Sequence, residues 1–263
     1  MLDALGRILL NIDAVLLALA RISGMFFMSP VFGRRNVPAI FTIGLILALT
    51  FIVAVYYPVY DEAMDISSYI ELAFYIIKEI FIGLIMGYVV LFTFSAFLLA
   101  GQLIDNQIGF GVVHILDPQT NIQIPLVGNF NNVLAMVLFF AMDGHHALIR
   151  LLMYSFEALP LGKAALSGDI VRPLFNMFVE FFVLGFKMAV PAIASALLAE
   201  VVFGILVRAI PQMNVFVIGL PFKILIGLVV LFSTVPLLIS MMDGAFSSMF
   251  KGIRSIIQGL NLQ

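Results

Sequence analysis

Asp143, His145 and His146 are the residues whose types come nearest to a metal site in this sequence. Carboxylate and imidazole groups bind divalent cations, but a zinc site on a helix needs two imidazoles on one face, as in HExxH. Neighbouring residues on a helix point in different directions, and no HExxH occurs in the chain. The pattern therefore predicts a turn after an apolar helix and no metal site.

Catalytic chemistry has little support elsewhere in the chain. His114 and Asp117 lie in one polar stretch, but no serine lies near them to act as the nucleophile of a triad. The sequence contains neither a P-loop nor a GxGxxG motif, so neither kind of phosphate-binding loop is present. We therefore expect no catalytic residue and no cofactor, and we predict that the chain is not an enzyme.

Charged residues inside apolar runs are the strongest functional signal. Those within or beside such runs are Asp13, Arg21, Lys78, Glu79, Glu180, Lys187, Glu200, Arg208 and Lys223. A charge at the centre of a bilayer costs about 2.5–3.5 kcal/mol on the insertion scale, so each needs a partner unless its side chain reaches the interface. Glu180 and Lys187 are separated by about 10 Å of helix rise, and Lys78 and Glu79 are adjacent and point apart. Partners are therefore expected on other helices or on other chains.

The composition indicates which elements carry these charges. Of the 263 residues, 63% are hydrophobic and only 11% are charged, whereas an ordinary soluble domain is about 25% charged. The chain is therefore expected to be an integral membrane protein, and its net charge of −2 argues against a nucleic-acid partner. Its apolar runs do not alternate as the strands of a membrane barrel do. The predicted fold is all-α, a polytopic membrane protein of long apolar helices and helical hairpins, with segments at 8–28, 39–57, 72–100, 126–142, 174–207 and 215–242.

Loop charges conflict with a count of simple crossings. Arg34 and Arg35 favour a cytoplasmic first loop, and five apolar segments follow it. An odd number of crossings would place the basic C-terminal end (Lys251) outside, where the positive-inside rule disfavours it. Either the rule does not hold for this chain or at least one segment is a re-entrant hairpin or an incomplete crossing. The segments longest for a plain crossing are 72–100 and 174–207.

Small residues in two of these segments are spaced for close helix packing. Gly83 and Gly87 form a glycine pair four residues apart, and Ala192 and Ala196 repeat the spacing. A chain with 20 glycines also produces such pairs by chance. Because the pairs cluster in the two charged segments, we expect close helix packing there.

The stretch 101–125 is too polar for a lipid-facing crossing. It alternates apolar residues with Gly, Asn and Gln, and Gly109 and Gly111 flank Phe110. Non-helical backbone at membrane depth is tolerated where protein buries it or where it lines a watery cavity. The stretch is therefore either such a buried segment or an ordinary cytoplasmic loop.

Further motifs run nearly from end to end. They are Arg21-Ile-Ser-Gly24, Pro30-Val-Phe-Gly33, Pro38, Lys78-Glu79 with Gly83 and Gly87, Ala100-Gly-Gln-Leu-Ile-Asp105 with Gln107 and Gly109-Phe110, Asp117-Pro118, Asp143-Gly144-His145, Pro191, Arg208, Pro211-Gln-Met-Asn-Val-Phe216 and Gly219-Leu-Pro-Phe-Lys223. In this order and at these spacings the chain resembles the FliR family, the R component of the flagellar type III secretion export gate, whose relatives in virulence secretion are the SctT proteins. Asp143 stands where a second glycine is common, a departure confined to a peripheral turn.

The resemblance implies a function and a setting. Members of the family are export-gate subunits in the bacterial inner (cytoplasmic) membrane, within the flagellar basal body. They lie beside P-type and Q-type membrane subunits, with the export-switch (B-type) protein on the cytoplasmic side. The gate is a closed, helically arranged pore for exported unfolded flagellar proteins. This chain is accordingly expected to help form and close the export channel and to be required for flagellum assembly.

Two sets of residues follow from the resemblance together with the charge pattern. In the family, the loop corresponding to Ile108–Gln123 acts as a plug in the lumen, and apolar side chains can close a pore by dewetting it. The whole chain, 1–263, is expected to be a single integral membrane helical domain that carries this loop. The expected plug residues are Gly109, Phe110, Gly111, Val112, Val113, Ile115 and Leu116. The expected contacts with neighbouring subunits are Arg21, Lys78, Glu79, Glu180, Lys187, Glu200, Arg208 and Lys223.

The alternative function is an ion-coupled small-molecule transporter, which also places charges in broken helices. Such transporters usually show two matching halves, whereas here only Arg34–Pro38 and Arg208–Pro211 echo one another. A scaffold subunit without a pore-lining part is a third hypothesis. A gate subunit co-purifies with P-type and Q-type proteins, and a transporter does not.

Overall fold

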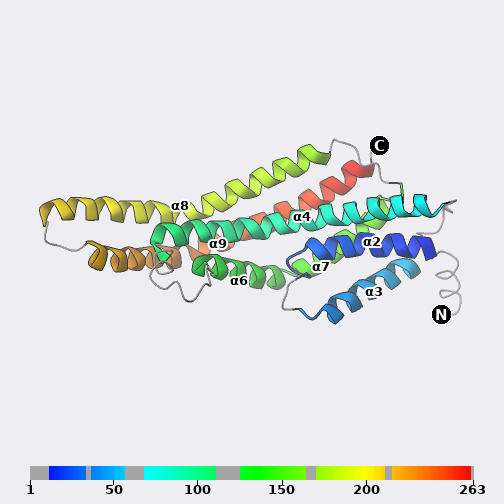
Figure 1. Cartoon of the computed structure of the whole chain (residues 1–263), viewed down its shortest axis with the longest axis horizontal. Helices are drawn as coiled ribbons and strands as arrows, with labels where there is room; N and C mark the ends of the chain where they lie inside the picture. Colours follow the sequence, from blue (N-terminus) through cyan, green and yellow to red (C-terminus); the bar gives the residue numbers. More distant parts are fainter. Residues whose placement is uncertain are drawn as a thin grey trace. The chain divides into compact units, whose positions relative to one another are not determined.

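The computed structural model describes residues 12–33, 37–56, 68–110, 125–163, 170–210 and 215–261. These residues form helices joined by turns, and no strand occurs among them, which confirms the predicted all-α fold. The helices are α2 (Ile12–Met28), α3 (Ala39–Tyr56), α4 (Tyr69–Ile108), α6 (Leu126–Ala141), α7 (Gly144–Ala158), α8 (Val171–Ala209) and α9 (Val215–Asn261) (Figure 1).

Four of these helices, α3, α4, α8 and α9, are long and apolar enough to cross a membrane. The shorter helices α6 and α7 pass the same test only as one bent pair, which would make five spans in the described part of the chain. This agrees with the prediction that not every apolar segment is a simple crossing. The two longest segments are not hairpins, because α4 and α8 are continuous helices of 40 and 39 residues. A helix of that length measures about 60 Å, twice the thickness of the hydrocarbon core.

Three helical stretches go beyond what the apolar segments predict. Helix α7 occupies a stretch expected to be a connection, and its buried residues Leu148 and Leu152 are four apart on one face. Helix α4 continues through residues 101–108, which we expected to belong to a loop, and α9 runs well past the predicted end at 242. Each stretch is too polar to be recognised as a span by its composition.

The chain divides into two compact units. Unit 1 comprises Met1–Phe92, Asp143–Phe178 and Ser247–Gln263, and unit 2 comprises Thr93–Met142 and Val179–Phe246. Helices α4, α8 and α9 each contribute residues to both units. The single domain expected over 1–263 stays a prediction.

In unit 1, α2 packs against α3 and against the first half of α4 (Figure 1). The backbones of α2 and α4 touch at glycines on both sides. A Cβ atom added at Gly24 would lie 2.6 Å from the carbonyl oxygen of Ile80, and one added at Gly83 would overlap the carbonyl oxygen of Arg21. At Gly87 an added Cβ would lie 2.8 Å from the carbonyl oxygen of Met25. The glycine pair therefore serves close helix packing, as the sequence predicts.

In unit 2, four phenylalanine rings join α4, α6 and α9. Phe139 of α6 lies 5.7 Å from Phe94 and 5.3 Å from Phe246 between ring centroids, and Phe97 lies 5.5 Å from Phe246. All four rings are buried, and these three contacts are edge-to-face, the arrangement that the ring quadrupoles favour. This cluster forms the aromatic core of the unit.

We predict that Gly83→Ala destabilises the chain, because the added methyl group would push against the backbone of α2 rather than against a movable side chain. Overpacking of this kind costs about 1–3 kcal/mol in free energy of unfolding. Gly44→Ala in α3 is the matched control, since an added Cβ there has no atom within 4 Å. Thermal unfolding of both variants in detergent measures the difference, and equal midpoints for the two would contradict the packing argument.

Candidate functional site: the base of the loop after α4 and the buried charges

Two members of the expected plug set, Gly109 and Phe110, lie within the described residues. Gly109 follows the end of α4 with a φ of 102°, a backbone conformation that favours glycine, and its N–H donates to the carbonyl oxygen of Asp105 at 3.2 Å. Gly109 is buried and Phe110 is half-buried. Gly111, Val112, Val113, Ile115 and Leu116 lie outside the described residues, as do His114 and Asp117.

Asp105 connects the end of α4 to the start of α6. Its carboxylate accepts hydrogen bonds from the N–H of Val127, 3.0 Å from each oxygen, and from the N–H of Gly128 at 3.1 Å. These N–H groups belong to the first turn of α6, whose N-cap residue Pro125 provides no side-chain cap. A buried carboxylate from another helix thus satisfies donors that a helix leaves unpaired at its N-terminus. Its negative charge also complements the helix dipole.

Close backbone contact reinforces this connection. A Cβ atom at Gly101 would overlap the Cα atom of Gly128 and lie 2.7 Å from the carbonyl carbon of Val127. Helix α9 completes the packing, because a Cβ at Gly227 would lie 2.5 Å from the side chain of Ile108. The described residues on either side of 111–124 therefore belong to one well-packed cluster of helices. We call this cluster, defined by Gly101, Asp105, Ile108, Val127, Gly128 and Gly227, the loop base.

Arg21 and Glu79 form an ion pair inside unit 1. Arg21 Nε donates to Glu79 Oε2 at 2.6 Å, and both side chains have 0% exposed surface. The guanidinium carbon also lies 4.6 Å from the ring centroid of Phe156, a distance suited to a cation–π contact. The charges lie on α2 and α4, so the prediction that partners lie on other helices is confirmed for this pair.

The same ion pair closes the C-terminal end of α7. Arg21 Nη1 donates to the carbonyl oxygens of Ser155 at 2.7 Å and of Leu159 at 3.1 Å, while the other carboxylate oxygen of Glu79 accepts from the N–H of Gly162 at 2.9 Å. The last carbonyls of a helix have no partners within it, and a cation is favourable there. Sequence reasoning missed Ser155, Leu159 and Gly162 because it did not recognise α7. The available signal was the Pro160 and Gly162 that follow an amphipathic stretch.

Four residues of the expected subunit-contact set have charge partners within this chain. We expected Arg21 and Glu79 to contact neighbouring subunits, but they are fully buried within this chain and pair with each other. Glu200 of α8 and Lys223 of α9 also pair with each other, as expected for partners on different helices, and both stay predictions as subunit contacts. The spacing rules consider only one helix at a time, so they could not find these pairs.

The remaining charged positions have different surroundings. Lys78 is half-buried, with its Nζ atom 4.9 Å from the ring centroid of Phe74. Glu180, Lys187 and Arg208 are exposed along α8. These four positions remain predictions as subunit contacts.

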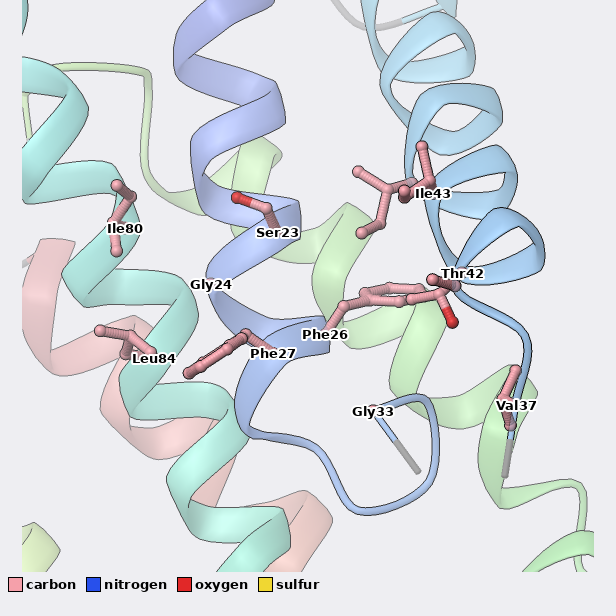
Figure 2. A pocket seen from close by; sticks show the side chains of 12 residues that line it. Ser23, Gly24, Phe26, Phe27, Gly33, Val37, Thr42, Ile43, Ile80 and Leu84 are labelled. Carbon is pink, nitrogen blue, oxygen red and sulfur yellow. The ribbon is translucent and has the colours of Figure 1, made fainter. Parts of the chain in front are cut away.

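A groove of about 620 Å³ lies between α2, α3 and α4. Figure 2 shows its mostly apolar lining, including Phe27, Ile43 and Leu84. The hydroxyl group of Ser23 donates back to the carbonyl oxygen of Ala20 at 2.9 Å, so it is engaged within α2. The groove is chemically suited to apolar groups, and its described lining contains no charged side chain.

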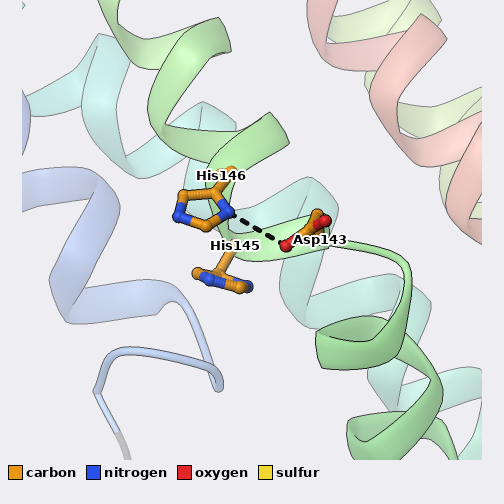
Figure 3. Close-up of side chains that lie close together, drawn as sticks. All are labelled: Asp143, His145 and His146. Atoms are coloured by element: carbon orange, nitrogen blue, oxygen red, sulfur yellow. Dashed lines mark hydrogen bonds and ion pairs between the residues drawn. The ribbon is translucent and has the colours of Figure 1, made fainter.

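Asp143, His145 and His146 lie together at the start of α7 (Figure 3). We expected the neighbouring histidines to diverge, but their ring centroids are 4.0 Å apart. Rotation of the side chains brings the rings together although their Cα atoms face different directions.

These features define a class of protein: a polytopic helical membrane protein whose helices meet at glycines and at buried, fully paired charges. The model for bacterial export proteins, family 1, matches residues 12–249. The chain is also 33% identical to the flagellar biosynthetic protein FliR of Bacillus subtilis (strain 168), over 93% of this chain and 94% of the relative. It is 30% identical to the FliR protein of Escherichia coli (strain K12), over 93% and 92%, and 31% identical to that of Aquifex aeolicus (strain VF5), over 93% and 93%. The chain therefore belongs to the FliR family of bacterial export proteins, as its motifs predict.

We predict that Glu79→Leu destabilises the chain by about 3–5 kcal/mol, because Arg21 would remain as a buried charge without its counter-ion. Glu200→Leu is the control. Its side chain is 50% exposed, so its loss should cost about 0–1 kcal/mol. Unfolding of the purified variants in detergent provides the comparison, and a Glu79 variant as stable as the Glu200 variant would refute the structural role of the pair.

Proposed function

We propose that this chain is a subunit of the flagellar type III protein export gate. It helps to form and close the channel through which unfolded flagellar proteins cross the bacterial inner membrane in the basal body. The observation that carries the proposal is the family match over residues 12–249, together with relatives named flagellar biosynthetic protein FliR that align over 93% of the chain.

Large apolar surfaces on single helices support an assembly with other subunits. In the most apolar 18-residue stretch of α8 only 22% of the residues are buried, whereas 56% are buried in the corresponding stretch of α4. Phe175, Phe182 and Phe186 are each more than half exposed on α8, and the charges of Glu180 and Lys187 occur in the same part of the helix. Lipid alone would solvate such a charge poorly at membrane depth. Neighbouring P-type and Q-type subunits, with the export-switch protein on the cytoplasmic side, are the proposed partners.

The assembly can be tested with Lys187→Leu. Lys187 is exposed on α8, so its loss should leave the chain folded and remove a polar contact with a neighbouring subunit. We expect the yield of chain co-purified with P-type and Q-type proteins to fall more than the yield of the chain alone. Lys251→Leu, also exposed on a helix but near the end of α9, is the matched control.

The outcome also distinguishes the competing functions. Equal losses of complex and free chain would indicate a folding defect and contradict the contact. A wild-type chain that purifies without P-type and Q-type proteins would contradict membership of the gate and favour an ion-coupled transporter. In cells, deletion of the gene should abolish export of flagellar proteins, and the wild-type gene should restore it.

We further propose that the segment beginning at Gly109 is the plug of the resting pore. A channel wide enough for an unfolded chain would dissipate the membrane potential unless it were obstructed, and apolar side chains can seal it by dewetting. The loop base supports this role because Asp105 and Gly101 hold both ends of the segment. Glycine at 109, with its positive φ, gives the backbone the freedom to turn there.

Deletion of Gly109–Leu116 tests the plug. The complex should still assemble, and cells that carry it should leak ions and small solutes.

Asp105→Ala should produce a weaker leak than the deletion, because removal of a helix cap costs about 0.5–2 kcal/mol and loosens the loop base. Asn106→Ala, an exposed neighbour on α4, is the control. A deletion complex that assembles in a tight membrane would refute the plug, and equal leaks from the two point variants would refute the role of Asp105.

A further inference from the structure

The turn between α6 and α7 contains a carboxylate that does not act as a helix cap. Asp143 is the N-cap residue of α7, a position where aspartate normally accepts a hydrogen bond from the first turn, yet it makes no such bond. Its φ is 55°, the one positive value outside glycine among the described residues. The left-handed conformation is uncommon for a residue with a side chain, although aspartate tolerates it. The carboxylate is therefore free to point elsewhere.

The carboxylate points to the imidazole group of His146, which lies beside that of His145. Asp143 Oδ1 lies 3.0 Å from Nδ1 of His146 (Figure 3). The rings of His145 and His146 are tilted by 38° with their centroids 4.0 Å apart. Each of the three residues offers one ligand atom, and these atoms all lie within 4.8 Å of one another. One carboxylate and two imidazoles thus converge on a small volume.

We propose that Asp143, His145 and His146 bind a divalent first-row transition-metal ion. Two ligand atoms about 2.0–2.2 Å from a zinc ion are separated by about 3.3 Å in a tetrahedral site. The contact between Asp143 and His146, at 3.0 Å, is already near this separation. Rotation of the side chains can bring the ligand atom of His145 equally close to those of Asp143 and His146, because the side chains of His146 and Asp143 are 63% and 70% exposed.

The donor set decides the class of ion. Neutral imidazole suits zinc, nickel, copper and iron, whereas calcium and magnesium prefer oxygen ligands. Three protein ligands leave at least one position for water or for a group from another molecule. The helix dipole at the start of α7 opposes a cation, and the full negative charge of Asp143 outweighs that partial charge.

An ordinary hydrogen bond explains less of this geometry. An exposed contact between side chains three residues apart on a helix contributes little to stability. Such a pair requires neither the left-handed backbone at Asp143 nor the second imidazole of His145 beside the first. A shared cation accounts for all three side chains at once.

Cobalt is the probe for the test, because it reports its coordination through visible absorption. The full-length chain, purified in detergent both alone and in its native membrane assembly, is stripped with a chelator and titrated with Co²⁺, then with competing Zn²⁺. We expect one high-affinity ion per chain. Asp143→Asn, His145→Ala and His146→Ala should each weaken binding at least tenfold, since loss even of a group that only supports a ligand weakens binding about 10–100-fold.

His114→Ala is the matched control, because His114 is the third histidine of the chain and lies far from the other two in sequence. It should bind Co²⁺ like the wild-type chain, with unchanged visible bands. A wild-type chain that binds no more Co²⁺ than the His146→Ala variant would overturn the proposal. Loss of binding in His114→Ala equal to that in His146→Ala would also overturn it. Thermal unfolding without metal establishes that the variants are folded, and Asp143→Asn preserves the shape of the side chain.

Discussion

The buried ion pair between Arg21 and Glu79 is the interaction on which unit 1 depends. Each charge would be costly to bury alone, so the pair must form and its remaining donors and acceptors must be satisfied. The hydrogen bonds to Ser155, Leu159 and Gly162 complete it, and they fix where α7 ends. Because Arg21 lies on α2 and Glu79 on α4, the pair joins three helices that are far apart in sequence. The pair is a structural centre, because all three nitrogen atoms of the guanidinium donate to partners within the chain.

The same principle operates at the start of α6. There Asp105 of α4 satisfies the first N–H groups, as Arg21 satisfies the last carbonyls of α7. Both α6 and α7 are too short to count as a span by themselves. The N-terminus of α6 and the C-terminus of α7 are each capped by a charged side chain from another helix. In a membrane the unpaired end of a helix has no water to bind, so such caps determine where short helices can lie. Helix α4 contributes to both caps, through Glu79 and Asp105.

Close backbone packing determines which helices become neighbours, a choice that apolar side chains alone do not make. Lipid tails are as apolar as leucine, so membrane helices gain little from burying apolar surface against one another. Backbone contact at Gly24, Gly83 and Gly101 therefore selects the neighbours. In the most apolar stretches of α8 and α9 only 22% and 17% of the residues are buried, so these stretches leave apolar surface for a larger assembly. The loop base belongs to the well-packed part of unit 2.

The sequence by itself determined the membrane class, the all-α fold, the family and the glycine packing at Gly83, because composition and local motifs carry that information. It also singled out the residues that matter, including Arg21, Glu79 and Asp105, without their partners. Only the tertiary structure decided that Arg21 pairs with Glu79, 58 residues away, and that Asp105 caps a helix 22 residues further on. Helical periodicity describes one helix at a time, and neither α3 nor α4 has one distinct polar face that would show which side is buried. Which helices become neighbours depends on where buried charges and helix ends can be satisfied together, and that is a property of the folded chain.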